Sequence, residues 1–216
     1  TETDRSVGRV ANWRMLFQPP YLSRSLVSWS MFSAGLITWY VVMVYVPTIL
    51  TSYGFELSNS VILAGAMTVL GGVGSVVMGP LADKYGRKLV WSLYVIITII
   101  SLFLLTSTES ITALLCIGAL VAFFGTGIMP ICKVYVAEQY PTELRGVGTG
   151  FGEAVSRIVG GVLATYYLAF FLAMGGVKAV FIFMAVAFGI AIIALWLWGQ
   201  ETAGRSVEDT ASTGEN

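Results

Sequence analysis

The chain has 216 residues, of which 56% are hydrophobic and 11% are charged, and its formal net charge at pH 7 is zero. Soluble domains carry about 25% charged residues, so this composition indicates a membrane protein and excludes an ordinary soluble domain. A neutral chain offers no basic surface to nucleic acid. Histidine is absent, which removes the commonest proton shuttle and metal ligand. We therefore expect neither a metal site nor a cofactor.

Six apolar segments are predicted to cross a membrane as helices, because each is long enough to span a hydrocarbon core about 30 Å thick. They cover residues 25–53, 57–81, 88–107, 110–139, 144–173 and 177–198. Pro47 is expected to kink the first span near its far end. The sequence thus predicts an all-α integral membrane bundle over residues 25–198, preceded by a polar linker (1–24) and followed by a polar tail (199–216).

The charges between the apolar segments predict how the bundle is oriented. Cytoplasmic loops of membrane proteins carry an excess of Lys and Arg. Lys178 is the single cation in the loops on one side, whereas ten cations lie on the side of the two chain ends. We expect both termini in the cytoplasm and the bundle in a plasma (inner) membrane. The ten cations are Arg5, Arg9, Arg14, Arg24, Lys84, Arg87, Lys88, Lys133, Arg145 and Arg205.

The loop between the second and third predicted spans has the sequence GPLADKYGRK over residues 79–88, with four charges in its last six residues. We expect Asp83 to lie at the N-terminus of the third span, where its carboxylate can accept from free backbone N–H groups. Arg87 and Lys88 can pair with carboxylates at neighbouring helix ends or with anionic lipid. The alternative is that the loop acts only as an orientation signal.

This loop, with the pattern G-x-L-a-D-[RK]-x-G-R-[RK], resembles the loop between the second and third helices of each half of a major facilitator superfamily transporter. In that family the loop holds helices together on the cytoplasmic side and releases them during the transport cycle. Glu138 and Arg145 flank the turn at Pro141, and they can pair with each other or with Arg87. The resemblance therefore implies a charge latch formed by Asp83, Arg87, Lys88, Glu138 and Arg145.

A second motif, EQYPTELRG over residues 138–146, is followed by Gly148, Gly150, Arg157 and Gly160. It resembles the branch of the superfamily that contains organic cation and anion transporters, synaptic vesicle glycoprotein 2 and bacterial niacin-type permeases. Sugar porters share its E-x-x-P-x-x-x-R portion.

The tail ETAGRSVE, residues 201–208, is similar to the end motif of the sugar porters. Gln200 and Ala203 stand where that motif has a proline and a lysine. Together the resemblances imply the C-terminal six-helix half of a twelve-helix transporter, built as a 3+3 repeat. The partners implied are membrane lipid and the N-terminal six-helix half of the same transporter. The chain begins with Thr1 rather than Met, and we expect a fragment or a processed piece.

Glycine is abundant in the second and fifth predicted spans, which occupy equivalent places in the two triplets of the implied repeat. Small residues at four-residue spacing let helices approach closely in lipid. The alternative is that membrane helices are simply richer in glycine than soluble ones. The spaced residues are Gly71, Ser75 and Gly79 in the second span, and Gly148 and Gly152 in the fifth.

Arg157 is the strongest candidate for a substrate-binding residue. It lies twelve residues after Arg145, which places it roughly 18 Å deep in a helix that starts at the membrane surface. An arginine at the bilayer centre costs about 2.5–3.5 kcal/mol on insertion scales, so it normally faces a polar cavity or a partner. Glu153 lies one turn earlier on the same face. Either Arg157 meets an anionic substrate group with Glu153 as resting partner or proton carrier, or the two form a permanent ion pair.

Aromatic side chains are candidates for lining the cavity, above all Trp39, Tyr40 and Phe124, although lipid-facing or packing roles fit them equally well. Lys133 can either face the cavity or extend to the cytoplasmic surface. The first span lacks the paired glutamines that sugar porters carry in the equivalent helix. We therefore favour an aromatic or carboxylate-bearing organic ion as the substrate.

The function that follows is secondary transport of a small organic solute by alternating access, either as proton-coupled symport or as facilitated exchange. Without histidine, proton coupling would need a carboxylate, either Glu153 or one in the other half. A sugar transporter of the same superfamily and a transport-inactive solute sensor remain alternatives. A membrane enzyme is disfavoured, because the sequence has no nucleophile–base pair and no metal-ligand spacing.

Overall fold

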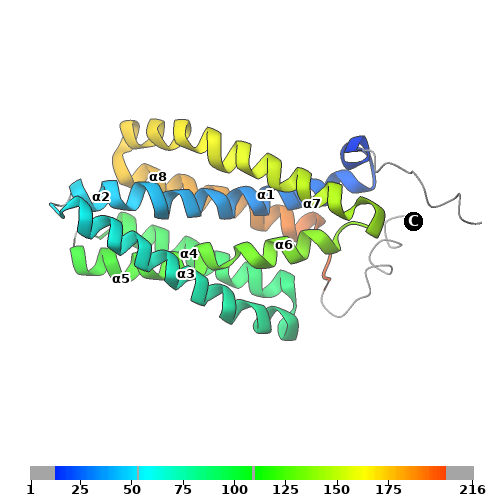
Figure 1. The fold of residues 1–216 in the computed structure, drawn as a ribbon, viewed down its shortest axis with the longest axis horizontal. Coiled ribbons are helices and arrows are strands. Elements are labelled where there is room, and N and C mark those ends of the chain that lie inside the picture. Colours follow the sequence, from blue (N-terminus) through cyan, green and yellow to red (C-terminus); the bar gives the residue numbers. More distant parts are fainter. Residues whose placement is uncertain (1–12, 53, 109, 203–216) are drawn as a thin grey trace, which may run out of the picture.

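The computed structural model describes residues 13–52, 54–108 and 110–202. Every regular element in these ranges is helical, and the long helices lie side by side along one axis (Figure 1). The elements are η1 (Trp13–Phe17), α1 (Tyr21–Tyr40), η2 (Val41–Tyr45), α2 (Val46–Ser52), α3 (Leu57–Tyr85), α4 (Arg87–Thr106), α5 (Ile111–Val121), η3 (Ala122–Thr126), α6 (Met129–Glu138), α7 (Thr142–Arg157), η4 (Ile158–Val162) and α8 (Leu163–Trp198).

Five helical stretches of the described residues are long and apolar enough to cross a membrane. They are Tyr21–Thr48, Leu57–Tyr85, Arg87–Thr106, Ile111–Glu138 and Thr142–Trp198. The first four agree with the first four predicted spans to within a few residues. The fifth contains both of the last two predicted spans in a single stretch of 57 residues.

This last stretch bends back on itself within α8. Its 57 residues would extend roughly 85 Å as one straight helix, far more than a bilayer core requires. Gly175 (φ −142°, ψ 17°) and Gly176 (φ 66°, ψ −161°) depart from helical geometry. The positive φ of Gly176 is a conformation that glycine adopts without steric cost. The ribbon reverses its direction there, at the end of the bundle opposite the described C-terminal segment (Figure 1).

Three π-helical turns interrupt the long helices: η2, η3 and η4. Pro47 and Pro130 each follow one of them, four residues after Met43 and Thr126 respectively. Proline has no N–H to donate to the carbonyl four residues earlier, which accounts for the change of helical register before each proline. The kink expected from Pro47 thus takes the form of the π turn η2. Such turns occur frequently at functional sites.

The core lies where α8 packs against α1 and against α4. Its large side chains include Phe32, Trp91 and Phe188, all at most 2% exposed. In contrast, α3 is the least covered of the five stretches, with 28% of its most apolar window buried against 56% in the first stretch. Ile62, Val69 and Val76 are 68%, 70% and 75% exposed. One face of α3 is therefore without cover from the described residues.

The opposite face of α3 packs closely on η3, as the spacing of small residues predicts. The hydroxyl of Ser75 donates to the carbonyl of Gly127, the residue after η3, at 3.1 Å. On the α4 side, the hydroxyl of Tyr94 donates to the carbonyl of Gly74 at 3.3 Å. A Cβ atom added at Gly71 or Gly74 would overlap with atoms of η3. Gly79, by contrast, has no atom of the described residues within 4 Å of an added Cβ.

Replacement of Gly74 by alanine tests this close approach. The new methyl group would overlap with the backbone carbonyl of Phe123, which cannot rotate away as a side chain can. Overpacking costs about 1–3 kcal/mol, so we expect a clearly lower half-denaturation temperature for the purified full-length protein in detergent. Gly189→Ala in α8 is the control, because no described atom lies within 4 Å of a Cβ there. Equal temperatures for both variants would contradict the packing of α3 on η3.

Candidate functional site

The ends of α4 and α6 are joined by an ion pair between Arg87 and Glu138. Arg87 is the first residue of α4 and Glu138 the last of α6. Their side chains are 14% and 23% exposed, so the pair is largely shielded from solvent. Arg87 also lies 3.6 Å from the carboxylate of Asp83, whose side chain is 72% exposed. The structure thus brings together three of the five residues predicted for the latch.

The expectation that Asp83 caps the third span is wrong. Helix α3 continues through Pro80 as far as Tyr85, so Asp83 lies in its last turn. The N-terminus of α4 is capped instead by Glu201, which follows α8. Its carboxylate accepts from the backbone N–H groups of Arg87 at 3.0 Å and Lys88 at 3.1 Å. A carboxylate at this position satisfies unpaired N–H groups and meets the positive end of the helix dipole.

The other two predicted latch residues have different neighbours. The ammonium group of Lys88 donates to the carbonyl of Gly199 at 3.0 Å and lies 4.7 Å from the centre of the Trp196 ring. It therefore binds the C-terminus of α8, where cations are favoured. Arg145 donates to the hydroxyl of Thr142 at 3.4 Å. It also lines a cavity of about 410 Å³ together with Lys133 and Glu138.

The turn between α6 and α7 is anchored to α1, which sets the position of α7. The guanidinium of Arg24 donates to the carbonyl of Gln139 at 3.0 Å, and the hydroxyls of Ser25 and Tyr140 lie 2.9 Å apart. Burial raises the pKa of Tyr140 above its ordinary value. The ring of Tyr140 lies over Gly148, where a Cβ would collide with it. This accounts for the tyrosine and the glycine in the motif.

A hollow of about 420 Å³ lies between α1, α6 and α7. One part of its wall is apolar, and includes Phe32, Leu36 and Trp39 of α1 and Met129 of α6. The other part carries three charged side chains: Lys133 of α6 and Glu153 and Arg157 of α7. The hollow therefore combines an aromatic wall with a charged one, and small-molecule sites have such a mixture of apolar lining and a few polar groups.

The three charged groups meet at one atom. The Oε1 oxygen of Glu153 accepts from the guanidinium of Arg157 at 2.9 Å and lies 3.7 Å from the ammonium of Lys133. Glu153 and Arg157 are four residues apart and share a helix face. All three remain open to the hollow, because the side chains of Arg157, Lys133 and Glu153 are 70%, 58% and 40% exposed.

The predicted substrate residues are only partly brought together. Arg157, Glu153 and Trp39 line the hollow. Tyr40 packs edge-to-face on Trp39, with ring centres 5.6 Å apart. Phe124 belongs to a different aromatic group, in η3, with its ring centre 4.9 Å from that of Tyr94.

Several lining residues were not predicted from the sequence: Phe32, Leu36, Pro130 and Ser156. Apolar and small side chains of this kind carry no signal that separates a cavity wall from a packed core. For Lys133, the structure favours the first of the two alternatives, because its ammonium lies beside Glu153 and in the hollow.

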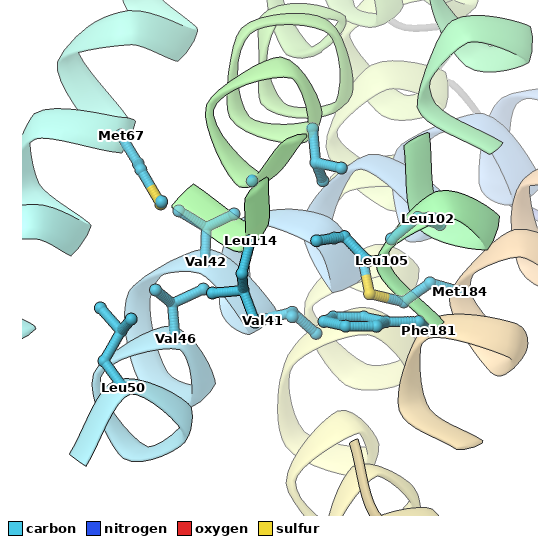
Figure 2. A pocket seen from close by; sticks show the side chains of 12 residues that line it. Val41, Val42, Val46, Leu50, Met67, Leu102, Leu105, Leu114, Phe181 and Met184 are labelled. Atoms are coloured by element: carbon cyan, nitrogen blue, oxygen red, sulfur yellow. The ribbon is translucent and has the colours of Figure 1, made fainter. Parts of the chain in front are cut away.

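A much smaller cavity, about 40 Å³, lies beside η2 and α2. Figure 2 shows its wall, formed by side chains such as Val41, Met67, Phe181 and Met184. All its lining residues are apolar or glycine, so it provides no partner for a charged solute. An apolar cavity of this kind also offers a water molecule no hydrogen bonds. The hollow around Glu153 is therefore the candidate site.

A family model described as the Major Facilitator Superfamily matches residues 27–214. The chain belongs to the major facilitator superfamily. This is a family of transporters and not of enzymes, and every regular element of the described residues is helical, as that family requires.

Three similar proteins illustrate the relationship. The inner membrane metabolite transport protein YdjE of Escherichia coli K12 is 30% identical over 198 residues, which cover 90% of this chain and 43% of that protein. The niacin transporter NiaP of Acinetobacter baylyi is 26% identical over 199 residues, 91% of this chain and 45% of that protein. A crystal structure of a double-tryptophan mutant of XylE has a TM-score of 0.70 at 20% identity, covering 99% of this chain and 46% of that one.

The likeness to XylE shows the fold alone, because the sequence identity is low. In each of the three comparisons the chain spans less than half the length of the other protein.

The shielded pair of Arg87 and Glu138 leads to a stability prediction. Removing one partner of a buried ion pair leaves an uncompensated charge and costs about 3–5 kcal/mol. We expect Arg87→Ala and Glu138→Gln each to lower the half-denaturation temperature of the full-length protein markedly, and the double variant to lose less than the sum of both.

Asp83→Asn is the matched control, since it breaks the pair of Arg87 with an exposed carboxylate. Exposed ion pairs contribute about 0–1 kcal/mol, so this variant should unfold close to the wild-type temperature. If the losses of Arg87→Ala and Glu138→Gln add up fully in the double variant, the two residues are not coupled and the ion pair is refuted.

Proposed function

We propose that the full-length protein is a secondary transporter that carries a small aromatic or carboxylate-bearing organic ion across the inner membrane by alternating access. The observation that carries this proposal is the convergence of Lys133 and Arg157 on Glu153 in a hollow walled by aromatic side chains. The names of the relatives support it, since one is an inner membrane metabolite transport protein and another a niacin transporter.

This chain would form the C-terminal six-helix half of the transporter, with both its ends in the cytoplasm. The turn at Gly175–Gly176 supports the count of six, because the helical residues before it and after it are each numerous enough to cross a bilayer. The share of each relative that the chain spans, 43% and 45%, fits one half of a twelve-helix protein. Six crossings place the first and last residues of the bundle on one side, and the ten cations of the sequence favour the cytoplasmic side.

The N-terminal six-helix half would cover the open face of α3. Ile62, Val69 and Val76 repeat every seven residues on that face and are all more than two-thirds exposed. Gly65, Gly72 and Gly79 have the same seven-residue spacing, and each lacks a described neighbour within 4 Å of an added Cβ. Apolar residues with this period form the seam along which one helix packs against another.

In the proposed site, Arg157 binds the anionic group of the substrate and Lys133 contributes a second positive charge. Trp39 offers its ring face to the aromatic part of the substrate, and Tyr40 holds Trp39 in place. A sugar has no charge to compensate that of Lys133 and Arg157. For this reason we favour an organic ion over a sugar.

Movement between the two access states would require the cytoplasmic end to open and close. Arg87 and Glu138 hold α4 to α6 at this end, and Glu201 holds the segment after α8 to α4. We propose that these contacts form when the cytoplasmic side is closed and break when it opens. Proton coupling would use the carboxylate of Glu153 or one in the N-terminal half.

Uptake of radiolabelled niacin into proteoliposomes that contain the full-length protein tests the function. We expect Arg157→Ala to raise the substrate concentration for half-maximal uptake about tenfold or more, because a hydrogen bond to a charged group contributes about 1.5–3 kcal/mol. Lys178→Ala, an exposed cation outside the hollow, is the control and should leave uptake unchanged. Unchanged affinity in a folded Arg157→Ala protein would refute the assigned role of Arg157.

The same vesicles distinguish transport from sensing and test the coupling ion. Saturable binding of an organic acid without any flux would favour a transport-inactive sensor. An inwardly directed proton gradient should increase the accumulation of substrate if the transporter is a proton symporter. Accumulation that ignores the gradient would rule out proton coupling while leaving facilitated exchange in place.

A further inference from the structure

We propose that ionised Glu153 is a built-in carboxylate that limits the site to substrates with a single carboxylate. The proposal rests on the proposed function of the hollow and assigns a substrate class to it. Two cations, Lys133 and Arg157, face one anion there, so the described wall has one positive charge in excess. One carboxylate on the substrate balances that charge.

The geometry explains why Glu153 can act as a substitute for a second substrate carboxylate. The guanidinium of Arg157 and the ammonium of Lys133 both approach the same oxygen, Oε1, at 2.9 and 3.7 Å. Arg157 and Lys133 therefore lie side by side around a single carboxylate. A dicarboxylate that used both cations would have to place one of its carboxylates next to Glu153. Like charges a few ångströms apart repel, and such a contact discriminates against the wrong ligand.

A purely structural ion pair looks different in this molecule. Arg87 and Glu138, which join two helices, are 14% and 23% exposed. Arg157 and Glu153 lie on the same helix, so their pair joins nothing, and their side chains are 70% and 40% exposed. The Lys133–Glu153 contact does link α6 to α7, but at 3.7 Å and with Lys133 58% exposed. The charges around Glu153 are thus available to a ligand, while those at the cytoplasmic end are not.

Glu153→Gln removes the negative charge and keeps the size of the side chain and an oxygen that can accept from Arg157. Because the three side chains are open to the hollow, we expect the variant to fold normally. The described wall then carries two positive charges without an anion. The proposal predicts that this variant gains affinity for a ligand with two neighbouring carboxylates.

The test measures the dissociation constants of two pyridine acids for the full-length protein by isothermal titration calorimetry. The probes are pyridine-3-carboxylate, which is niacin, and pyridine-2,3-dicarboxylate, which adds one carboxylate on the neighbouring ring atom. We expect wild-type protein to prefer the monocarboxylate, and Glu153→Gln to shift the ratio of the two constants roughly tenfold or more toward the dicarboxylate. Wild-type protein and Glu153→Gln differ at this one residue, so the rest of the full-length protein does not contribute to the change in the ratio of the two constants.

Two control variants separate the role of this carboxylate from a general effect of charge. Glu143→Gln removes the same charge from an exposed position, ten residues or about 15 Å along α7, and should keep the wild-type ratio. Glu153→Asp keeps the charge in the hollow and should also keep the preference for the monocarboxylate.

The result that overturns the inference is a Glu153→Gln protein that binds niacin with the wild-type ratio of the two constants. A wild-type preference for the dicarboxylate overturns it as well. If wild-type protein binds neither probe nor any other organic acid, the proposed function itself fails, and that outcome is distinct because it appears before any variant is compared.

Discussion

Placing charge inside a membrane costs free energy, and this cost explains how the charged side chains of the bundle are arranged. A charged side chain at the bilayer centre costs about 2.5–3.5 kcal/mol or more, so it needs a partner or a wet cavity. Lys133, Glu153 and Arg157 satisfy this condition together, since they share one carboxylate oxygen and face one hollow. The π turn η4 begins directly after Arg157. The apolar side chains of α1 line the same hollow as the three charged ones.

The charged side chains of the bundle form two groups, one shielded from solvent and one exposed. At the end of the bundle where α4 begins, Arg87 and Glu138 are shielded, and Glu201 satisfies the first N–H groups of α4. These contacts hold α4, α6 and the segment after α8 together. Deeper in the bundle, the charges around Glu153 are accessible and therefore suited to exchange partners with a solute. The close packing of α3 on η3 fixes the position of these helices between the two groups of charges. The contacts of the α6–α7 turn with α1 do the same for α6 and α7.

Features that depend on composition or on local spacing could be predicted from the sequence. These include the membrane class, the approximate spans, and the pairing of Glu153 with Arg157 one helical turn away. Contacts between distant segments could not be predicted. The sequence left two possible environments for Lys133, because its partner Glu153 lies on another helix. The cap of α4 comes from Glu201, which is more than a hundred residues away. The prediction for Asp83 was wrong because α3 extends to Tyr85, four residues beyond the predicted end of that span at residue 81.

We expect the hollow beside Arg157 to be wet although it lies at membrane depth. In a cysteine-free full-length protein, Leu36→Cys places a thiol in its wall, and Ile190→Cys places one on the outer face of α8, where Ile190 is 60% exposed. The most direct measurement is the rate at which a charged, water-soluble methanethiosulfonate modifies each variant in lipid vesicles. We expect the Leu36→Cys protein to react, niacin to slow that reaction, and the Ile190→Cys protein to stay inert. A Leu36→Cys protein as unreactive as the Ile190→Cys protein would contradict this expectation.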